Sequence, residues 1–164
     1  MSKRFLGYLA AGIAAVALLV AGVFYIQRGA HLELEGTVLK VRTVPVEDGS
    51  SIAIIDFRFV NTADYRFIVR RVDVLLEDKQ GQVMEGSTIS DSDAARVFQA
   101  FPSLGQKFNE SLLIRTRIEP HQSMDRMISA RFEFSEQQLL GRKGLRVRVE
   151  DVDGAVSEIV EGAR

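Results

Sequence analysis

The two histidines, His31 and His121, are the first residues to test for chemistry, because imidazole can transfer protons or bind metals. A zinc site would need further ligands at suitable spacing, and the chain has no cysteine to supply them. Ser123 lies close to His121, but no strand–serine–helix elbow surrounds it, and a serine hydrolase needs an oriented Ser-His-acid set. We therefore expect both histidines to lie in solvated loops, with no catalytic residue among this set.

Two acidic pairs could suggest calcium: Asp91 with Asp93, and Asp151 with Asp153. A calcium loop needs further ligands at fixed offsets and a distal glutamate, and neither segment supplies them. We interpret the first pair as a helix start and the second as a turn. The glycine-flanked segment 141–144 is too short to cradle a phosphate. The sequence thus predicts no metal and no cofactor, although two dispersed carboxylates could still meet in the folded chain and make it an enzyme.

An uncharged apolar stretch fills residues 5–26, near the start of the chain. As a helix these residues would span about 33 Å, enough for a hydrocarbon layer of about 30 Å. Lys3 and Arg4 precede the stretch, and the positive-inside rule therefore keeps the N-terminus in the cytoplasm. The predicted organisation is a cytoplasmic N-terminus at 1–4, a transmembrane helix at 5–26, a juxtamembrane hinge at 27–31 and an extracytoplasmic domain at 32–164.

A cleaved signal peptide is the alternative to this membrane anchor. Its apolar region would measure about 7–15 residues and would end at a small-residue cleavage site. Here the run is longer and ends through Phe24 and Tyr25, which favours an uncleaved anchor. Gly7, Ala11 and Ala15 recur at the four-residue spacing that lets membrane helices pack closely, so they are the candidate residues for packing against other membrane subunits.

The charge balance limits the partners of the external domain. Three of the 21 basic residues, Lys3, Arg4 and Arg28, flank the apolar stretch, which leaves 18 basic against all 22 acidic residues beyond it. This acidic balance argues against nucleic acid as a ligand. Without cysteine the domain has no disulfide, and burial of apolar side chains must stabilise it.

Most of residues 32–164 alternate between apolar and polar side chains, the period of half-buried strands. Regular turn signals between short strands predict an all-β fold, an antiparallel two-sheet sandwich with a short helical insert. One strand should bend near Arg70. The predicted strands are 32–44, 52–60, 65–77, 82–85, 112–118, 124–134, 145–152 and 155–160, with helices at 91–101 and 135–141.

The insert that begins with the helix at 91–101 is a candidate binding element. It carries Phe98, Phe101 and Phe108, which would either cover one open end of the sandwich or form a lip that binds a partner. A set of outward basic residues, with Arg146 and Arg148 as its leading members, could touch an acidic partner or lipid headgroups, or could simply pair with local glutamates. The full set is Arg115, Arg117, Arg131, Arg142, Lys143, Arg146 and Arg148.

The segments at 55–62, 72–76 and 118–123, followed by a Phe-Glu-Phe strand, resemble bacterial immunoglobulin-like domains, and are similar to late-embryogenesis-abundant type 2 domains. Those families usually carry glycine where His121 stands here, and the helix at 91–101 looks like an insertion in their pattern. The resemblance covers residues 52–154. It implies an immunoglobulin-like β-sandwich without catalytic residues.

We therefore expect a non-enzymatic accessory or scaffold subunit, a single-pass protein of a bacterial inner membrane whose periplasmic domain binds a protein partner. Edge strands and end loops of a sandwich offer the surfaces for such binding. The alternative is a module that holds a small ligand or lipid in a cavity between the sheets.

Overall fold

The computed structural model describes residues 12–13, 16–18, 20–22, 34–46 and 49–162. The chain divides into two units, Met1–His31 and Leu32–Arg164. Within the described part of the chain, no helix has both the length and the apolar character to cross a membrane. The candidate packing residues Gly7, Ala11 and Ala15, like His31, lie outside the described residues.

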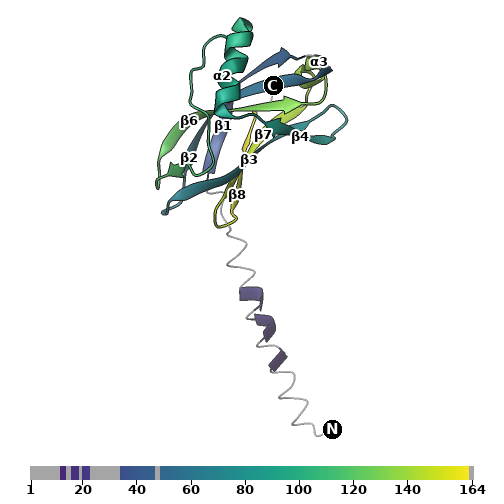
Figure 1. The fold of residues 1–164 in the computed structure, drawn as a ribbon. Coiled ribbons are helices and arrows are strands. Elements are labelled where there is room, and N and C mark those ends of the chain that lie inside the picture. Colours follow the sequence, from purple (N-terminus) through teal and green to yellow (C-terminus); the bar gives the residue numbers. More distant parts are fainter. Residues whose placement is uncertain (1–11, 14–15, 19, 23–33, 47–48, 163–164) are drawn as a thin grey trace. The chain divides into compact units, whose positions relative to one another are not determined.

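The second unit is built mainly of strands, as predicted (Figure 1). Short helices interrupt the strands in two places, after β4 and after β6. The elements in chain order are β1 Leu34–Pro45, β2 Ser51–Asn61, β3 Phe67–Glu77, β4 Val83–Thr88, the helix α2 Asp91–Ala100, the 3-10 helix η2 Pro102–Leu104, β5 Arg117–Ile118, β6 Ser123–Phe132, α3 Glu136–Leu140, β7 Gly144–Asp151 and β8 Val156–Val160.

The strands form one barrel-like sheet, whereas the sequence predicted two separate sheets. The strand order is β4-β6-β2-β1-β8-β7-β3-β5, and a further pairing of β4 with β3 closes a ring that leaves out only β5. Ring closure removes the free edges of an open sheet, but the number of paired residues differs between neighbouring strands of this ring. β1 and β2 pair along their whole length, whereas the parallel contact between β1 and β8 consists of Thr37 opposite Val160. Alternation alone does not predict such closure, because both folds place one face of every strand inward.

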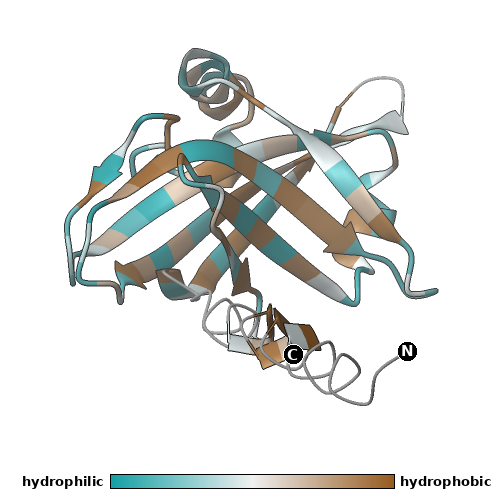
Figure 2. Cartoon of the chain, turned by 90° about the horizontal axis from the view of Figure 1, so that it is seen from below, coloured by the Kyte–Doolittle hydropathy of each residue, from teal (hydrophilic) through white to brown (hydrophobic). Residues whose placement is uncertain are grey.

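Apolar side chains fill the inside of the ring, and hydropathy alternates along the strands that surround it (Figure 2). The bulkiest members of this cluster, Phe57, Phe59, Phe67 and Phe132, are at most 1% exposed. β2 differs from the other strands because it is buried on both faces from Ser51 to Phe57. Its alternate residues Ile52 and Ile54 belong to a second apolar cluster on the outer surface.

The insert covers this outer surface and not an open end of the fold, so that part of the prediction was wrong. α2 lies outside the ring in Figure 2. Ala94 of α2 and Leu104 of η2 pack with Ile52 and Ile54 of β2 and with Met127 of β6. We call this covered side the insert face. The helix itself begins as predicted, with the Ser90 hydroxyl accepting from the Asp93 amide at 3.2 Å.

The predicted strand at 112–118 was also wrong in its first five residues, because only Arg117 and Ile118 are in β5. The preceding segment, residues 105–116, crosses the strands instead of running along one; we call it the strap. The Leu112 amide donates to Met127 O of β6 at 2.8 Å, and the Arg115 amide donates to Val69 O of β3 at 2.6 Å. An alternating pattern is therefore compatible with a crossing segment whose inward residue, Leu112, is buried.

One local prediction, the bend in the third predicted strand, is confirmed. β3 shifts register against β7 between Val69 and Arg71, which is the predicted bend near Arg70. His121 has a φ of 58°, the left-handed backbone conformation that glycine adopts most easily.

Candidate functional site: a window in the barrel wall

β3 and β4 separate beyond their hairpin and leave an opening in the barrel wall, which we call the window. They pair from Glu77 opposite Val83 to Val74 opposite Gly86, after which β4 turns to pair with β6 through Ser87 and Thr88. The opening is a cleft of about 440 Å³. Its lining comes from β3, β4 and the strap, namely Arg70, Arg71, Val72, Asp73, Glu85, Gly86, Ser87, Thr88 and Ile114.

Gly86 makes this change of partner possible. A Cβ at position 86 would lie 2.7 Å from the ring of Phe132 and 3.0 Å from Cβ of Ala130. Real side chains do not approach so closely, so β4 can cross over the core here only because the residue has no side chain. Gly86 is buried in consequence.

The window leaves part of the β3 edge without a neighbouring strand. On this edge Phe67 and Ile68 pair with β5, and Val69 exchanges hydrogen bonds with the strap at Thr116 and Arg115. Pairing resumes at Val74 with β4. Among the described residues no strand pairs with Arg70–Asp73 on that side. Such an edge is a template for hydrogen bonding with another extended chain.

An exposed ion triad spans the window. The Arg71 guanidinium contacts Asp73 on its own strand at 2.7 Å and Glu85 on β4 at 3.2 Å. The hydrogen bond and charge of Asp73, with a smaller effect of Glu85, raise the pKa of Arg71 above its ordinary value. Arg70 points its charge to Glu150 of β7 at 3.3 Å. Since these groups are largely exposed, they hold the two strands together only weakly.

The strap presents apolar side chains to solvent, Leu113 and Ile114 near the window and Phe108 over Arg42 of the insert face. Leu113 is 52% exposed, Ile114 66% and Phe108 70%. Ile114 also lines the window itself. Large apolar side chains on consecutive exposed positions of an otherwise charged surface are typical of protein contact sites.

The structure separates the five residues predicted to contact a partner. Phe98 and Phe101 are partly buried against the outer apolar cluster of the insert face, whereas Phe108 remains exposed on the strap. Arg146 and Arg148 lie on β7, across the ring from β2 and the insert. The phenylalanines and the arginines therefore do not form one surface.

Most of the basic residues predicted to form a patch are paired locally. Arg142 is buried and contacts Glu161 at 2.6 Å, and Lys143 and Arg146 both contact Glu77. Arg131 contacts Glu133 at 3.3 Å. Three members, Arg115, Arg117 and Arg148, are exposed and have no ion pair with any described residue. Two of these three, Arg115 and Arg117, lie next to the window.

Sequence reasoning missed a buried ion pair between Arg42 and Asp56. Arg42 and Asp56 are 8% and 4% exposed and contact each other at 2.7 Å under the insert. Arg42 also donates to the carbonyls of Leu104 and Gln106, and Asn109 donates to Asp56 at 2.9 Å. The Arg42 guanidinium lies 5.0 Å from the ring of Phe98 and 5.8 Å from that of Phe108. The apolar residues of the insert, which follow later in the chain, were the sequence feature that could have indicated a covered outer face of β2.

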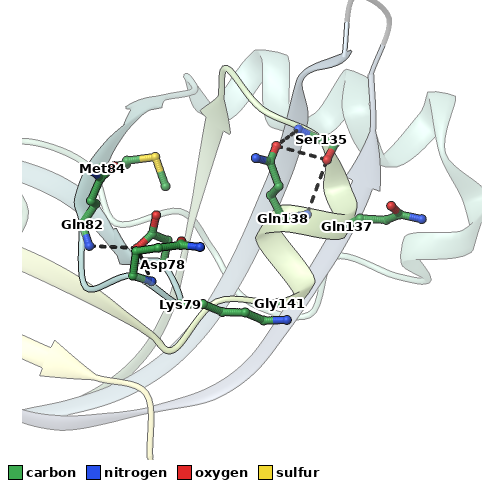
Figure 3. A pocket seen from close by; sticks show the side chains of 9 residues that line it. Asp78, Lys79, Gln82, Met84, Ser135, Gln137, Gln138 and Gly141 are labelled. Carbon is green, nitrogen blue, oxygen red and sulfur yellow. Dashed lines mark hydrogen bonds between the residues drawn. The ribbon is translucent and has the colours of Figure 1, made fainter.

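A second cleft, of about 400 Å³, lies between the β3–β4 hairpin and α3 (Figure 3). Its polar groups already stabilise the chain around it. Asp78 accepts from the amides of Gln80 and Gln82, which shapes the hairpin turn. Gln138 closes a capping box with Ser135 at the start of α3. The polar groups that Figure 3 joins by hydrogen bonds thus stabilise the hairpin turn and the start of α3, and we do not assign this cleft a ligand.

The groups first considered for chemistry have structural partners. His121 is exposed and its Nε2 lies 3.0 Å from Asp64. Asp151 is buried and accepts from the Ile68 amide at 2.7 Å, and Asp91 contacts Lys107 of the strap. No group of three or more potential metal ligands occurs among the described residues.

Comparisons with known proteins give a likeness of structure only. No family model matches the chain, and no curated protein matches it. An uncharacterised β-sandwich protein from Clostridium difficile is similar at 12% identity and a TM-score of 0.42, over 79% of this chain and 84% of its own. A conserved hypothetical protein from Bacillus anthracis is similar at 13% identity and a TM-score of 0.36, over 77% of this chain and 87% of its own. The β-rich domain described above therefore rests on this chain's own structure.

Proposed function

We propose that this chain is a non-enzymatic, membrane-anchored accessory subunit that binds a protein partner through the strap and the window. The observation that carries the proposal is the exposure of the adjacent residues Leu113 and Ile114 on the strap, beside an unpaired strand edge. Exposed apolar anchors supply most of the binding energy of protein interfaces, and an open edge supplies register.

The interior of the barrel supports protein binding over the alternative, a ligand or lipid held inside the fold. The inner apolar cluster packs Phe57 against Phe59 with their ring centroids 5.7 Å apart, and both rings are buried. Ligand pockets are concave spaces of several hundred Å³ lined by such side chains, whereas here the side chains contact one another. The two clefts described above lie at the surface of the domain, and of the buried residues in this cluster only Val72 lines one of them.

The proposed anchor is the apolar stretch 5–26, with the N-terminus in the cytoplasm of a bacterial cell and the barrel in the periplasm. Its described residues are helical, and large apolar side chains among them are exposed, with Ile13 at 62% and Leu18 at 74%. A helical stretch that exposes such residues is suited to lipid. An immunoglobulin-like ancestry of the barrel belongs to the same proposal.

Co-purification from gently solubilised native membranes tests the proposal with the full tagged chain. We expect a partner protein to be recovered in stoichiometric amount, and to be lost when Leu113→Ser and Ile114→Ser are combined. Leu140→Ser is the matched control, because Leu140 is 52% exposed, as Leu113 is, but belongs to α3.

Two outcomes would contradict the proposal. Recovery of the chain alone excludes a stable partner, and a partner lost equally in the Leu140→Ser control does not bind the strap. The anchor is tested in parallel by Gly7→Leu, Ala11→Leu and Ala15→Leu, which we expect to release membrane subunits while leaving a partner of the strap bound.

A further inference from the structure

We propose that the window takes an acidic, extended peptide segment, which adds as a strand beside Arg70–Asp73 of β3. This inference rests on the proposed function and specifies the chemistry of the partner. Strand addition explains the window better than a globular contact does, because one wall of the cleft is the unpaired edge of β3 at Arg70–Asp73.

The backbone geometry sets the length and position of the added strand. The open edge begins after Val69, which the strap occupies, and ends before Val74, where β4 pairs. Ser87 and Thr88 of β4 form the opposite wall of the cleft. They pair with β6 on one side, and their other side faces the window. An incoming segment would thus contact β3 with its main chain over about four residues, and its alternate side chains would point inward and outward.

An apolar side chain of the added strand that points into the cleft would find apolar partners at its rim. Ile114 lines the window and is 66% exposed, and Val72 on the adjoining strand is 8% exposed. A small β-branched side chain on the added strand would cover both. This contact would bury surface that the free domain leaves in water, which favours binding.

The charge at the rim selects an acidic segment. Arg115 and Arg117 flank the edge, since the Arg115 amide bonds to Val69 and Arg117 pairs with Ile68. Both side chains are exposed and form no ion pair with any described residue, whereas the acidic residues of the window, Asp73 and Glu85, are already occupied by Arg71. The rim therefore carries uncompensated positive charge on a domain that is otherwise acidic, and complementary charge steers and orients a partner.

The side chain of Arg71 blocks this site in the free domain. Its guanidinium bridges β3 and β4 through Asp73 at 2.7 Å and Glu85 at 3.2 Å, across the space that the added strand would fill. Entry requires the longer of these contacts, to Glu85, to open. A carboxylate of the incoming segment can then replace Glu85, so the pairing of Arg71 is kept and the opening costs little.

The test uses the full chain in detergent micelles and a dye-labelled probe of alternating glutamate and valine, about eight residues long. We expect the probe to bind, binding to weaken as salt is raised, and hydrogen exchange of the β3 segment 70–73 to slow. A probe of identical side chains with alternate backbone nitrogens methylated removes the main-chain donors. We expect that probe to bind at least about tenfold more weakly.

Charge-reversal variants separate the rim from the rest of the surface. Arg115→Glu combined with Arg117→Glu should weaken the acidic probe at least about tenfold and should favour a lysine–valine probe. Arg96→Glu is the matched control, because Arg96 has an 80% exposed side chain on α2, outside the window. Glu85→Gln should strengthen binding of the acidic probe, because it removes a competing carboxylate and leaves the Arg71 guanidinium free to pair with the probe.

The inference is overturned if the acidic probe fails to bind, if methylated and unmethylated probes bind equally, or if the Arg96→Glu control loses binding as much as the rim variant. Preferential binding of anionic phospholipid vesicles through Arg115 and Arg117 would also overturn it, in favour of a lipid surface. The proposed function fails separately: a partner that depends on Leu113 and Ile114 but does not compete with the probe leaves that function intact and excludes strand addition.

Discussion

The insert face and the window lie over different strands of one barrel, and their polar groups differ in burial. The insert face covers β1, β2 and β6, and the window lies between β3 and β4. On the insert face Arg42 and Asp56 are buried and bonded to each other, and further bonds reach Leu104, Gln106 and Asn109. At the window Arg71, Asp73 and Glu85 also form ion pairs, but the arginine side chain is 57% exposed. A buried charge must be paired, whereas an exposed one can change partners at little cost.

This difference separates stability from recognition within one small domain. The insert face removes apolar surface of β2 from water and adds a second core to the barrel. The window leaves a strand edge, an exposed isoleucine and ion pairs of an exposed arginine available for contact. Substitutions at the two places should therefore differ in their effects on the free energy of unfolding, even where the residue types are the same.

The largest expected effect is that of Arg42→Met. It leaves the Asp56 carboxylate buried with only Asn109 as a side-chain partner, and we expect it to lower the free energy of unfolding by about 3–5 kcal/mol. Arg71→Met removes the same group at the window, where it is exposed, and we expect a much smaller loss. Urea unfolding of the full chain in detergent, followed by circular dichroism, measures both values.

The combined variant Arg42→Met with Asp56→Leu sharpens the comparison. It removes both buried charges, and we expect it to recover much of the stability that Arg42→Met loses. Equal losses for Arg42→Met and Arg71→Met would contradict the distinction between the two faces.

The second effect concerns the crossing of β4 at the window. Gly86→Ala places a Cβ within 3.0 Å of Phe132 and Ala130, and we expect this overpacking to cost about 1–3 kcal/mol. Gly144→Ala is the matched control, because Gly144 also lies in a strand and a Cβ there meets nothing within 4 Å. Thermal unfolding of the two variants provides the measurement. A Gly86→Ala variant as stable as its control would show that β4 can shift, and that the window has no fixed geometry.

The smallest effect is expected where the insert joins the strap. Hydrogen bonds from Lys107 and then Ser111 lower the pKa of Asp91 below its ordinary value. A carboxyl with a lowered folded-state pKa stabilises the fold above its unfolded pKa of about 3.9, and this contribution is lost as the pH falls through the folded value. We expect Lys107→Met to raise the pKa of Asp91 toward its ordinary value, which carbon-detected titration of the carboxyl resonance can measure. An unchanged pKa would mean that Lys107 does not hold the strap to α2.

Local sequence signals predicted most of the secondary structure. The alternation of Ile55, Phe57 and Phe59 placed β2, and the acidic residues after Ser90 indicated the start of α2. These predictions succeeded because strand alternation and helix capping depend on residues a few positions apart. The alternating segment 112–118 shows the limit: the same pattern belongs here to a strap that crosses from β6 to β3.

The candidate site could not be predicted in the same way. The sequence singled out Phe98, Phe101 and Phe108 together, but only the fold decided that Phe98 packs against the cluster under the insert and Phe108 stays in solvent. Arg115 and Arg117 were recognised as basic, and the positions of the strap and β5 placed them beside an unpaired edge. Which charges remain unpaired depends on neighbours far apart in the chain.

The sequence by itself determined a β-rich domain without cysteine, two short helices, a bend in β3 and an apolar stretch of membrane-spanning length. Only the tertiary structure decided that the sheet closes into a ring, that the insert covers β2, and that β3 and β4 separate at Gly86. The physical reason is the range of the forces involved. Helix and strand propensity, alternation and helix capping depend on residues close together in the chain. Closure of the ring, the covering of β2 by the insert and the open edge of β3 depend on which strands, distant in sequence, pair with one another.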